Sequence, residues 1–206
     1  MGSPWVERLG AFAPAGLGSV AVETGTCKGY GAEALAPFFS RVITIELSEE
    51  LYRFSRDRLA PVPNVECRHG SSPEVLRELL PSLSPADGVF FFLDAHWSGD
   101  RTVPWEKSKW KGYGHDTAHS GRGALPSGPE QCPLAEELRV IVRECRGPAC
   151  ILIDDARSVG KRDAGFPGED WSHLTRELLL EIVGPRLEGF RELERPSQWF
   201  LRLIQR

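Results

Sequence analysis

The sequence contains no long hydrophobic run, no Cys-x-x-Cys pair and no large excess of charge of either sign. Its longest apolar run, Val89–Leu93, is far shorter than the roughly 20 residues that a membrane-spanning helix needs. The formal net charge is -4, so the overall balance does not favour a polyanionic partner such as DNA or RNA. We therefore expect no membrane span and no nucleic-acid partner.

The marks of secretion and lipidation are also missing. The first residues have no basic region before an apolar run, and Val6 stands where a myristoylation signal needs Ser or Thr. An odd number of cysteines without a signal peptide is typical of reduced cytosolic thiols. We expect a cytoplasmic protein whose cysteines are small buried hydrophobic residues. These are Cys27, Cys67, Cys132, Cys145 and Cys150.

What the sequence does have is enough apolar material for one core. Its 206 residues are 41% hydrophobic and 26% charged, which fits a single globular domain over 1–206. Apolar runs of strand length alternate with amphipathic segments, which is typical of an α/β fold with a doubly wound, mostly parallel sheet and helices on both faces. The expected strands cover 19–24, 41–46, 64–68, 89–93 and 149–153. The expected helices are 29–38, a segment capped by Ser48, a segment with Ser72 as N-cap and Pro73 at its first position, a segment opened by Pro133, and 171–183.

Two further strands are expected at the C-terminus, over 188–194 and 198–204. Only Arg195, Pro196 and Ser197 join them, and these are too few residues for a crossover between parallel strands. The sheet should therefore end in an antiparallel hairpin.

A glycine-containing turn follows the first expected strand. Gly25 and Gly29 would let the backbone approach a ligand closely, and the helix that starts there would point its amide dipoles at the ligand. Glu46 closes the next strand about 20 residues beyond Gly25, where an acidic side chain meets ribose hydroxyls in Rossmann units. A dinucleotide fingerprint fails, because Cys27 and Tyr30 occupy its second and third glycine positions.

The pattern Glu-x-Gly-x-x-x-Gly, here Glu23, Gly25 and Gly29, resembles motif I of the class I S-adenosylmethionine-dependent methyltransferases. The order of strands and helices also resembles that family's Rossmann-like, seven-stranded sheet. The resemblance implies S-adenosylmethionine as cofactor, with Ser71 at the position that contacts adenine. The implied cofactor-binding residues are Glu23, Thr24, Gly25, Thr26, Gly29, Glu46, Gly70, Ser71 and Asp94.

Three carboxylates end neighbouring strands: Asp94 follows one, and Asp154 and Asp155 follow the next. Like charges held together raise one another's pKa unless a cation neutralises them, and an oxygen-only cluster suits Mg²⁺, Mn²⁺ or Ca²⁺. The arrangement resembles the metal site of the divalent-cation-dependent O-methyltransferases of the catechol type and the macrocin and novobiocin sugar type. That resemblance implies metal ligands at Asp94, Asp154 and Asp155. The alternative is that Asp94 only contacts cofactor and Asp155 caps a turn.

His96 is the candidate general base beside Asp94, since an imidazole can accept the proton of an activated hydroxyl. The catechol type reads Leu-Asp-His-Trp-Lys, whereas here Ala95 intervenes and Ser98 replaces the lysine. A His96 that only bonds a backbone carbonyl is the alternative. Among the other polar residues, His69 is interpreted as structural, and the helix dipole explains Glu136 and Glu137 without a catalytic role.

A long irregular stretch, 95–131, leaves the carboxyl end of the fourth strand, where ligands bind in open α/β sheets. We interpret it as a substrate-facing insertion. Its aromatic residues either pack the loop down or line an apolar pocket. These are Trp97, Trp105, Trp110 and Tyr113. The segment 101–122 is locally basic, which favours either an anionic substrate or a solvated surface.

The sequence thus predicts transfer of a methyl group from S-adenosylmethionine to a hydroxyl of a small molecule, such as a phenol, a sugar or another secondary metabolite, assisted by Mg²⁺. The transfer would be an in-line displacement in which positioning dominates. Two alternatives stay open: a metal-independent N- or carboxyl-methyltransferase, and an enzyme directed at RNA or protein. The pattern does not fix the oligomeric state.

Overall fold

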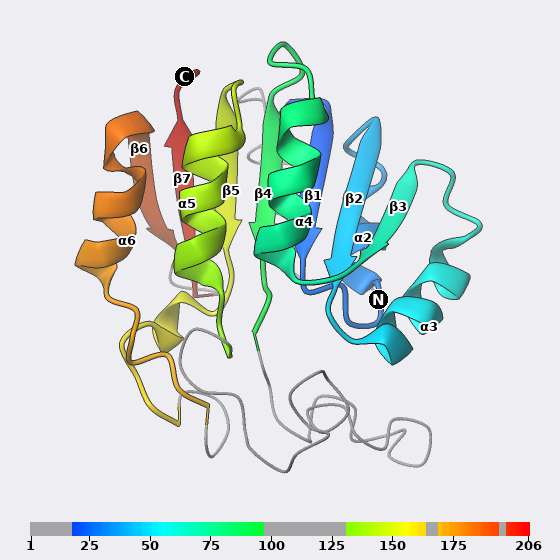
Figure 1. Ribbon diagram of the computed structural model, residues 1–206, viewed down its shortest axis with the longest axis horizontal. Helices are drawn as coiled ribbons and strands as arrows, with labels where there is room; N and C mark the ends of the chain where they lie inside the picture. Colours follow the sequence, from blue (N-terminus) through cyan, green and yellow to red (C-terminus); the bar gives the residue numbers. More distant parts are fainter. Residues whose placement is uncertain (1–17, 97–130, 164–168, 194–196) are drawn as a thin grey trace.

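The computed structural model describes residues 18–96, 131–163, 169–193 and 197–206. A single seven-stranded sheet runs through the protein, in the order β3-β2-β1-β4-β5-β7-β6 (Figure 1). The strands are β1 Val20–Thr24, β2 Arg41–Glu46, β3 Val65–His69, β4 Val89–Leu93, β5 Ala149–Ile153, β6 Leu187–Leu193 and β7 Gln198–Leu203. The expected strands are confirmed to within one or two residues at each end.

The direction of the strands confirms the expected topology. Each of β1 to β5 pairs in parallel with its neighbour, and β7 is antiparallel to both β5 and β6. The hairpin does not simply continue the sheet, because β7 lies between β5 and β6. Because β1, β2, β4 and β5 are parallel, their carboxyl ends share one edge of the sheet, at the lower side in Figure 1.

Helices cover both faces of the sheet. They are α2 Tyr30–Leu35, α3 Glu49–Leu59, α4 Ser72–Leu79, α5 Leu134–Glu144 and α6 Arg176–Val183, with short 3-10 turns η2 Leu80–Ser82, η6 Ala156–Ser158 and η7 Gly184–Arg186. In Figure 1, α4, α5 and α6 lie in front of the sheet, and their apolar residues share one core cluster. The opposite cluster contains residues of α2 and the end of α3.

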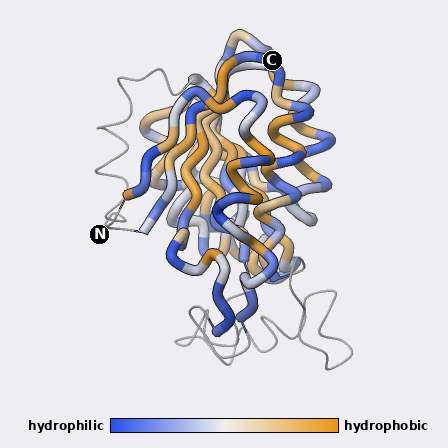
Figure 2. Tube along the Cα trace, turned by 90° about the vertical axis from the view of Figure 1, so that its left-hand side faces the viewer, coloured by the Kyte–Doolittle hydropathy of each residue, from blue (hydrophilic) through white to orange (hydrophobic). Residues whose placement is uncertain are grey.

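Alternate residues of each strand face these two clusters, as the twofold period of a strand requires. On β4, for example, Phe91 belongs to the first cluster, whereas Phe90 and Phe92 belong to the second. Strands buried on both faces are apolar throughout, which explains the near-continuous hydrophobic runs in the sequence. Figure 2 shows these apolar strands at the centre of the molecule.

Two helix starts differ from expectation. The N-cap of α4 is Ser71 and not Ser72, which is the first helical residue and donates its hydroxyl to the buried carboxylate of Glu137. The last helix begins at Arg176 after the N-cap Thr175, whose Oγ1 accepts from the Leu178 amide at 3.0 Å, and not near 171. In both places a tertiary contact competes with a local signal. Ser72 binds the carboxylate of Glu137, and Trp171 is buried in the core.

All five cysteines are free thiols, as expected, and three of them are buried. Within the described part of the chain, none of the helices has the length and apolar character needed to cross a membrane.

Candidate functional site

The glycine turn is wedged between the ends of β2 and β4. The backbone amides of Gly25 and Thr26 both donate to the carbonyl of Ile45, at 3.0 and 3.2 Å. Gly25 has a φ of 83°, and a Cβ at that position would lie 2.6 Å from the carbonyl oxygen of Asp94. Only glycine fits such a conformation and such a close approach. The predicted cofactor turn therefore contacts the backbone of the first predicted metal ligand.

Glu46 fastens this turn to the segment after β2. Its buried carboxylate accepts from the Cys27 amide at 2.8 Å through Oε2 and from the Ser48 amide at 2.9 Å through Oε1. Burial raises the pKa of Glu46 to about 7, against the lowering effect of these backbone hydrogen bonds. Each carboxylate oxygen has a second lone pair, so the predicted role toward ribose hydroxyls is compatible with both contacts.

Glu23 is the second buried acid of the turn. Its Oε2 accepts from Thr44 Oγ1 at 2.6 Å, and the hydroxyl of Thr26 lies 2.5 Å from that of Thr44. Burial raises the pKa of Glu23 to about 8, and the Thr44 hydrogen bond partly offsets it. Thr24, at the end of the same strand, is also buried. These side chains brace the turn from inside, so any direct contact with cofactor stays a prediction.

The predicted adenine side of the site lies beyond β3. The Gly70 amide donates to the carbonyl of Glu46 at 2.9 Å, which holds the start of α4 next to the glycine turn. Ser71 caps α4 through its backbone conformation and makes no side-chain cap hydrogen bond. His69 contacts the Leu47 carbonyl through Nε2 at 3.1 Å and stacks on Tyr52. This arrangement agrees with the structural interpretation of His69.

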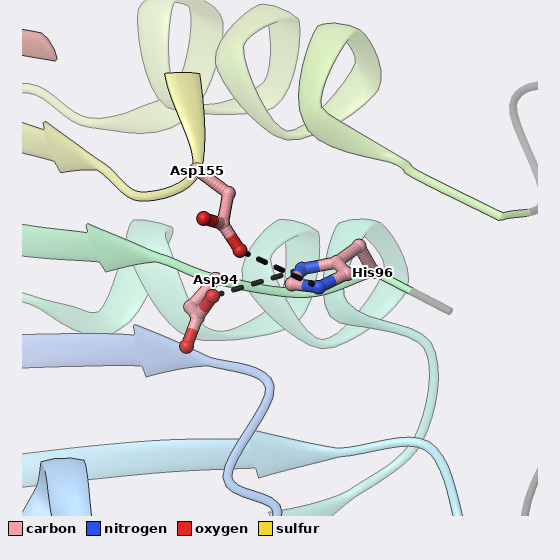
Figure 3. Close-up of side chains that lie close together, drawn as sticks. All are labelled: Asp94, His96 and Asp155. Atoms are coloured by element: carbon pink, nitrogen blue, oxygen red, sulfur yellow. Dashed lines mark ion pairs between the residues drawn. The ribbon is translucent and has the colours of Figure 1, made fainter. Parts of the chain in front are cut away.

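At the ends of β4 and β5, carboxylates lie around the imidazole of His96. β4 and β5 are parallel neighbours, so Asp94 and Asp155 emerge side by side, and Figure 3 shows His96 between them. His96 Nδ1 lies 3.6 Å from Asp94 Oδ1, and Nε2 lies 3.9 Å from Asp155 Oδ2. One ligand atom from each of these three residues lies within 4.8 Å of the other two. Among the described residues, this group has the composition and spacing to hold a metal ion.

Electrostatics within this group favour a cation. Burial raises the pKa of Asp94 well above its ordinary value, and repulsion from Asp154 and Asp155 raises it further. Asp155 has a φ of 47°, a left-handed conformation that aspartate and asparagine adopt more often than other residues with a side chain. Its side chain makes no cap hydrogen bond to the following turn. The capping role that the sequence allowed for Asp155 is therefore not observed.

Asp154, the third predicted metal ligand, is held by two hydrogen bonds. Its Oδ1 accepts from Gln198 Nε2 at 3.1 Å and from the Asp155 amide at 2.9 Å. It lies outside the group of three potential ligands, and His96 completes that group instead. Asp154 connects β7 to the strand end that carries Asp155. A direct role for Asp154 as a ligand stays a prediction.

Two residues that the sequence did not single out complete the surroundings of His96. Glu169 is only 2% exposed, and its Oε1 lies 3.9 Å from His96 Nε2. The indole N–H of Trp171 donates to the same Oε1 at 3.0 Å, and the Trp171 ring packs edge-on against His96 at 5.3 Å. No local pattern indicates this contact, because the sequence predicts that a helix begins at residue 171.

Glu137 lies in the first turn of α5, as the helix-dipole interpretation requires. It is also 1% exposed and accepts a hydrogen bond from the Ser72 hydroxyl. Burial raises its pKa to about 7, and the Ser72 hydrogen bond partly offsets this. Its neighbour Glu136 is half exposed and pairs with Arg77, as expected for a surface position. The predicted substrate residues Trp97, Trp105, Trp110 and Tyr113 lie outside the described residues, as does the basic segment 101–122.

No protein-family model matches the chain, and a search of curated proteins by sequence gives no match. Solved structures do match. An O-methyltransferase from Bacillus cereus in complex with SAH is 16% identical, with a TM-score of 0.62 over 98% of this chain and 82% of that one. The O-methyltransferase TomG from Streptomyces achromogenes, in complex with SAM, is 18% identical, with a TM-score of 0.55 over 100% and 82%.

An rRNA methylase from Streptococcus thermophilus is 12% identical, with a TM-score of 0.50 over 100% of this chain and 98% of that one. At these identities the likeness concerns the fold. The chain has the Rossmann-like, seven-stranded fold of the S-adenosylmethionine-dependent methyltransferases, as the resemblance in motif I implied.

Proposed function

We propose that this protein is an S-adenosylmethionine-dependent methyltransferase that methylates a hydroxyl group of a small molecule with the help of a divalent cation. The site has two halves, the glycine turn and the group of Asp94, His96 and Asp155. The observation that carries the proposal is the contact between them. The glycine turn packs directly against the backbone of Asp94, with no room for a side chain at Gly25. A methyl donor in the turn would thus lie next to an acceptor held at Asp94, His96 and Asp155.

Each half has its own task in this proposal. The glycine turn and Glu46 hold the adenosyl cofactor, while Asp94 and Asp155, with a third side chain nearby, hold the cation. A bound cation supplies Lewis-acid polarisation of the acceptor hydroxyl. His96 lies where it can either take the hydroxyl proton or bind the cation. Holding the oxygen and the methyl carbon in line at about 3 to 3.5 Å accounts for most of the rate enhancement.

An RNA acceptor is the second candidate, because one of the matching folds is that of an rRNA methylase. The net charge of -4 favours the small molecule, since RNA affinity depends on neutralised phosphates. Filter binding at two salt concentrations separates the two. RNA affinity that falls steeply with salt supports the RNA acceptor, and no retained RNA at low salt supports the small molecule.

Calorimetry and product analysis test the main proposal. We expect S-adenosylhomocysteine to give a binding signal and NADH to give none. With catechols, phenols and glycosides as acceptors, methylated product should form, and excess chelator should lower turnover at least about 100-fold, reversibly on adding metal. Heat with NADH alone would reject the cofactor assignment, whereas full activity in chelator would reject the cation and favour a metal-independent N- or carboxyl-methyltransferase.

A further inference from the structure

We infer that His96 is itself a ligand of the cation, through Nδ1, and that Glu169 accepts a hydrogen bond from its Nε2–H. The centre is then a mixed nitrogen and oxygen site that prefers a transition metal such as Mn²⁺ over Mg²⁺. This inference rests on the proposed function, since it concerns the same site. It differs from the oxygen-only site, with Asp154 as third ligand, that the sequence implied.

The first argument is the state of Nδ1. This atom is buried and has no hydrogen-bond partner among the residues that the structure describes. Its nearest acidic group is Asp94 Oδ1 at 3.6 Å, which is too far for a hydrogen bond. A buried nitrogen without a partner is costly unless something binds it. A cation between Nδ1 and the Asp94 carboxylate would satisfy both groups.

The second argument is the opposite ring nitrogen. Metal-binding histidines almost always donate their other N–H to a carboxylate, carbonyl or water, which fixes the tautomer and the ring orientation. Glu169 Oε1 and Asp155 Oδ2 both stand 3.9 Å from Nε2, and the indole of Trp171 fixes the Glu169 oxygen in place. Because such contacts often tighten only in the loaded site, the 3.9 Å separation fits a hydrogen bond that closes when the cation binds.

The third argument concerns the competing role of Asp154. Its Oδ1 is already shared between Gln198 and the Asp155 amide, whereas the His96 ring lies next to the carboxylates of both Asp94 and Asp155 (Figure 3). Ligand atoms around a cation with bonds of about 2.1 Å lie roughly 3 to 4 Å apart. The ligand atoms of Asp94, His96 and Asp155 all lie within 4.8 Å of one another, so a small contraction brings the group to this spacing.

The donor set then selects the metal. Mg²⁺ and Ca²⁺ bind oxygen ligands, whereas an imidazole nitrogen suits the first-row transition metals, whose affinity for such a site rises from Mn²⁺ along the row. Two carboxylates and one imidazole therefore discriminate against Mg²⁺. His96 would serve as a ligand and not as the general base that the sequence suggested.

Magnetic resonance on the intact protein tests this without any turnover. Mn²⁺ added to the metal-free chain should bind at one site, and its electron spin-echo spectrum should carry ¹⁴N modulation from an imidazole. Mg²⁺ should displace it only at a concentration at least about tenfold higher, following the donor preference. Bound Mn²⁺ without ¹⁴N modulation, or equal affinity for the two cations, would overturn the inference.

Variants then identify the imidazole. His96→Ala should abolish the ¹⁴N modulation and weaken Mn²⁺ binding by more than the change at Glu169. Glu169→Gln should keep the modulation and weaken binding about 10- to 100-fold, the usual effect of losing an outer-shell partner. His69→Ala, which removes an imidazole outside the group, should change neither. A His96→Ala protein with unchanged modulation would contradict the assignment, and the wild-type spectrum remains decisive if that variant does not fold.

Failure here can be told apart from failure of the proposed function. S-adenosylhomocysteine is titrated into the same metal-free protein by calorimetry. If S-adenosylhomocysteine binds and the Mn²⁺ spectrum shows no ¹⁴N modulation, only the His96 assignment is rejected. An imidazole-bound Mn²⁺ in a protein that binds no S-adenosylhomocysteine supports the metal assignment and sinks the methyltransferase.

Discussion

The two halves of the site are held together in different ways. Around the glycine turn, every acid is tied by hydrogen bonds of normal length, such as those from the Cys27 and Ser48 amides to Glu46. Around His96, the acids stand 3.6 to 3.9 Å from the ring, beyond hydrogen-bonding distance. In the first half, protein groups satisfy the acids by hydrogen bonding. In the second half, acids of like charge lie close together, and a cation would bridge them.

The difference has an origin in the chain. The glycine turn uses residues from one short stretch, 23–48, whose strands are direct neighbours. The group around His96 draws on β4, β5 and the crossover before α6. Pre-organised contacts suit a cofactor that must bind in one orientation, and separated charged ligands suit an ion that supplies its own attraction. The predictions below ask whether the two halves can be broken independently.

The largest effect is expected from Asp94→Ala. It removes one cation ligand, so turnover should fall about 10³-fold or more, which corresponds to the several kcal/mol that Lewis-acid activation supplies. Because Asp154 and Asp155 repel the charged form of Asp94, the melting temperature without metal should stay the same or rise. Asp57→Ala, at an exposed position of α3, is the matched control. Equal loss of cofactor binding in Asp94→Ala would show that the halves are not separable.

A smaller effect, on the other half alone, is expected from Glu46→Gln. The amide keeps one acceptor oxygen, so either the Cys27 or the Ser48 amide loses its partner and the turn loosens. The dissociation constant for S-adenosylhomocysteine should rise about 10- to 100-fold, equivalent to roughly 1.5–3 kcal/mol for a hydrogen bond to a charged group. Calorimetry should show unchanged Mn²⁺ binding. Glu66→Gln, on the exposed edge strand β3, should leave both affinities as they are.

The smallest effect is expected on the free energy of unfolding, and it concerns the buried acid Glu137. Folding raises the pKa of Glu137 from 4.5 to about 7, so this acid stabilises the fold fully below about pH 4.5, and that contribution is lost as the pH rises through 7. Glu137→Gln removes this dependence. At pH 8 the variant should be about 1–3 kcal/mol more stable than the wild type, and nearly equal at pH 4.5.

Denaturant unfolding at both pH values measures the change. The adjacent Glu136→Gln, at a half-exposed position, is the control and should follow the wild type at both. A parallel pH dependence in wild type and Glu137→Gln would mean that the carboxyl of Glu137 is not the titrating group.

The features that depend on local spacing could be predicted from the sequence. Strand-length apolar runs fix the strands, three linking residues force the antiparallel hairpin, and an acid directly after a strand must emerge at the sheet edge. For this reason the glycine turn, Glu46, Asp94 and Asp155 could be placed without a structure. Their neighbourhood follows from the register of parallel strands.

Which side chains meet at that edge depends on how the strands and crossovers pack in the folded chain. This packing inserts β7 beside β5, which gives Asp154 a partner in Gln198, and it folds the crossover so that Glu169 and Trp171 reach His96. It also buries Glu137 against Ser72, a contact that the sequence does not indicate. These contacts join residues far apart along the chain, and close packing of the helices and crossovers selects them. Local periodicity carries no information about such partners.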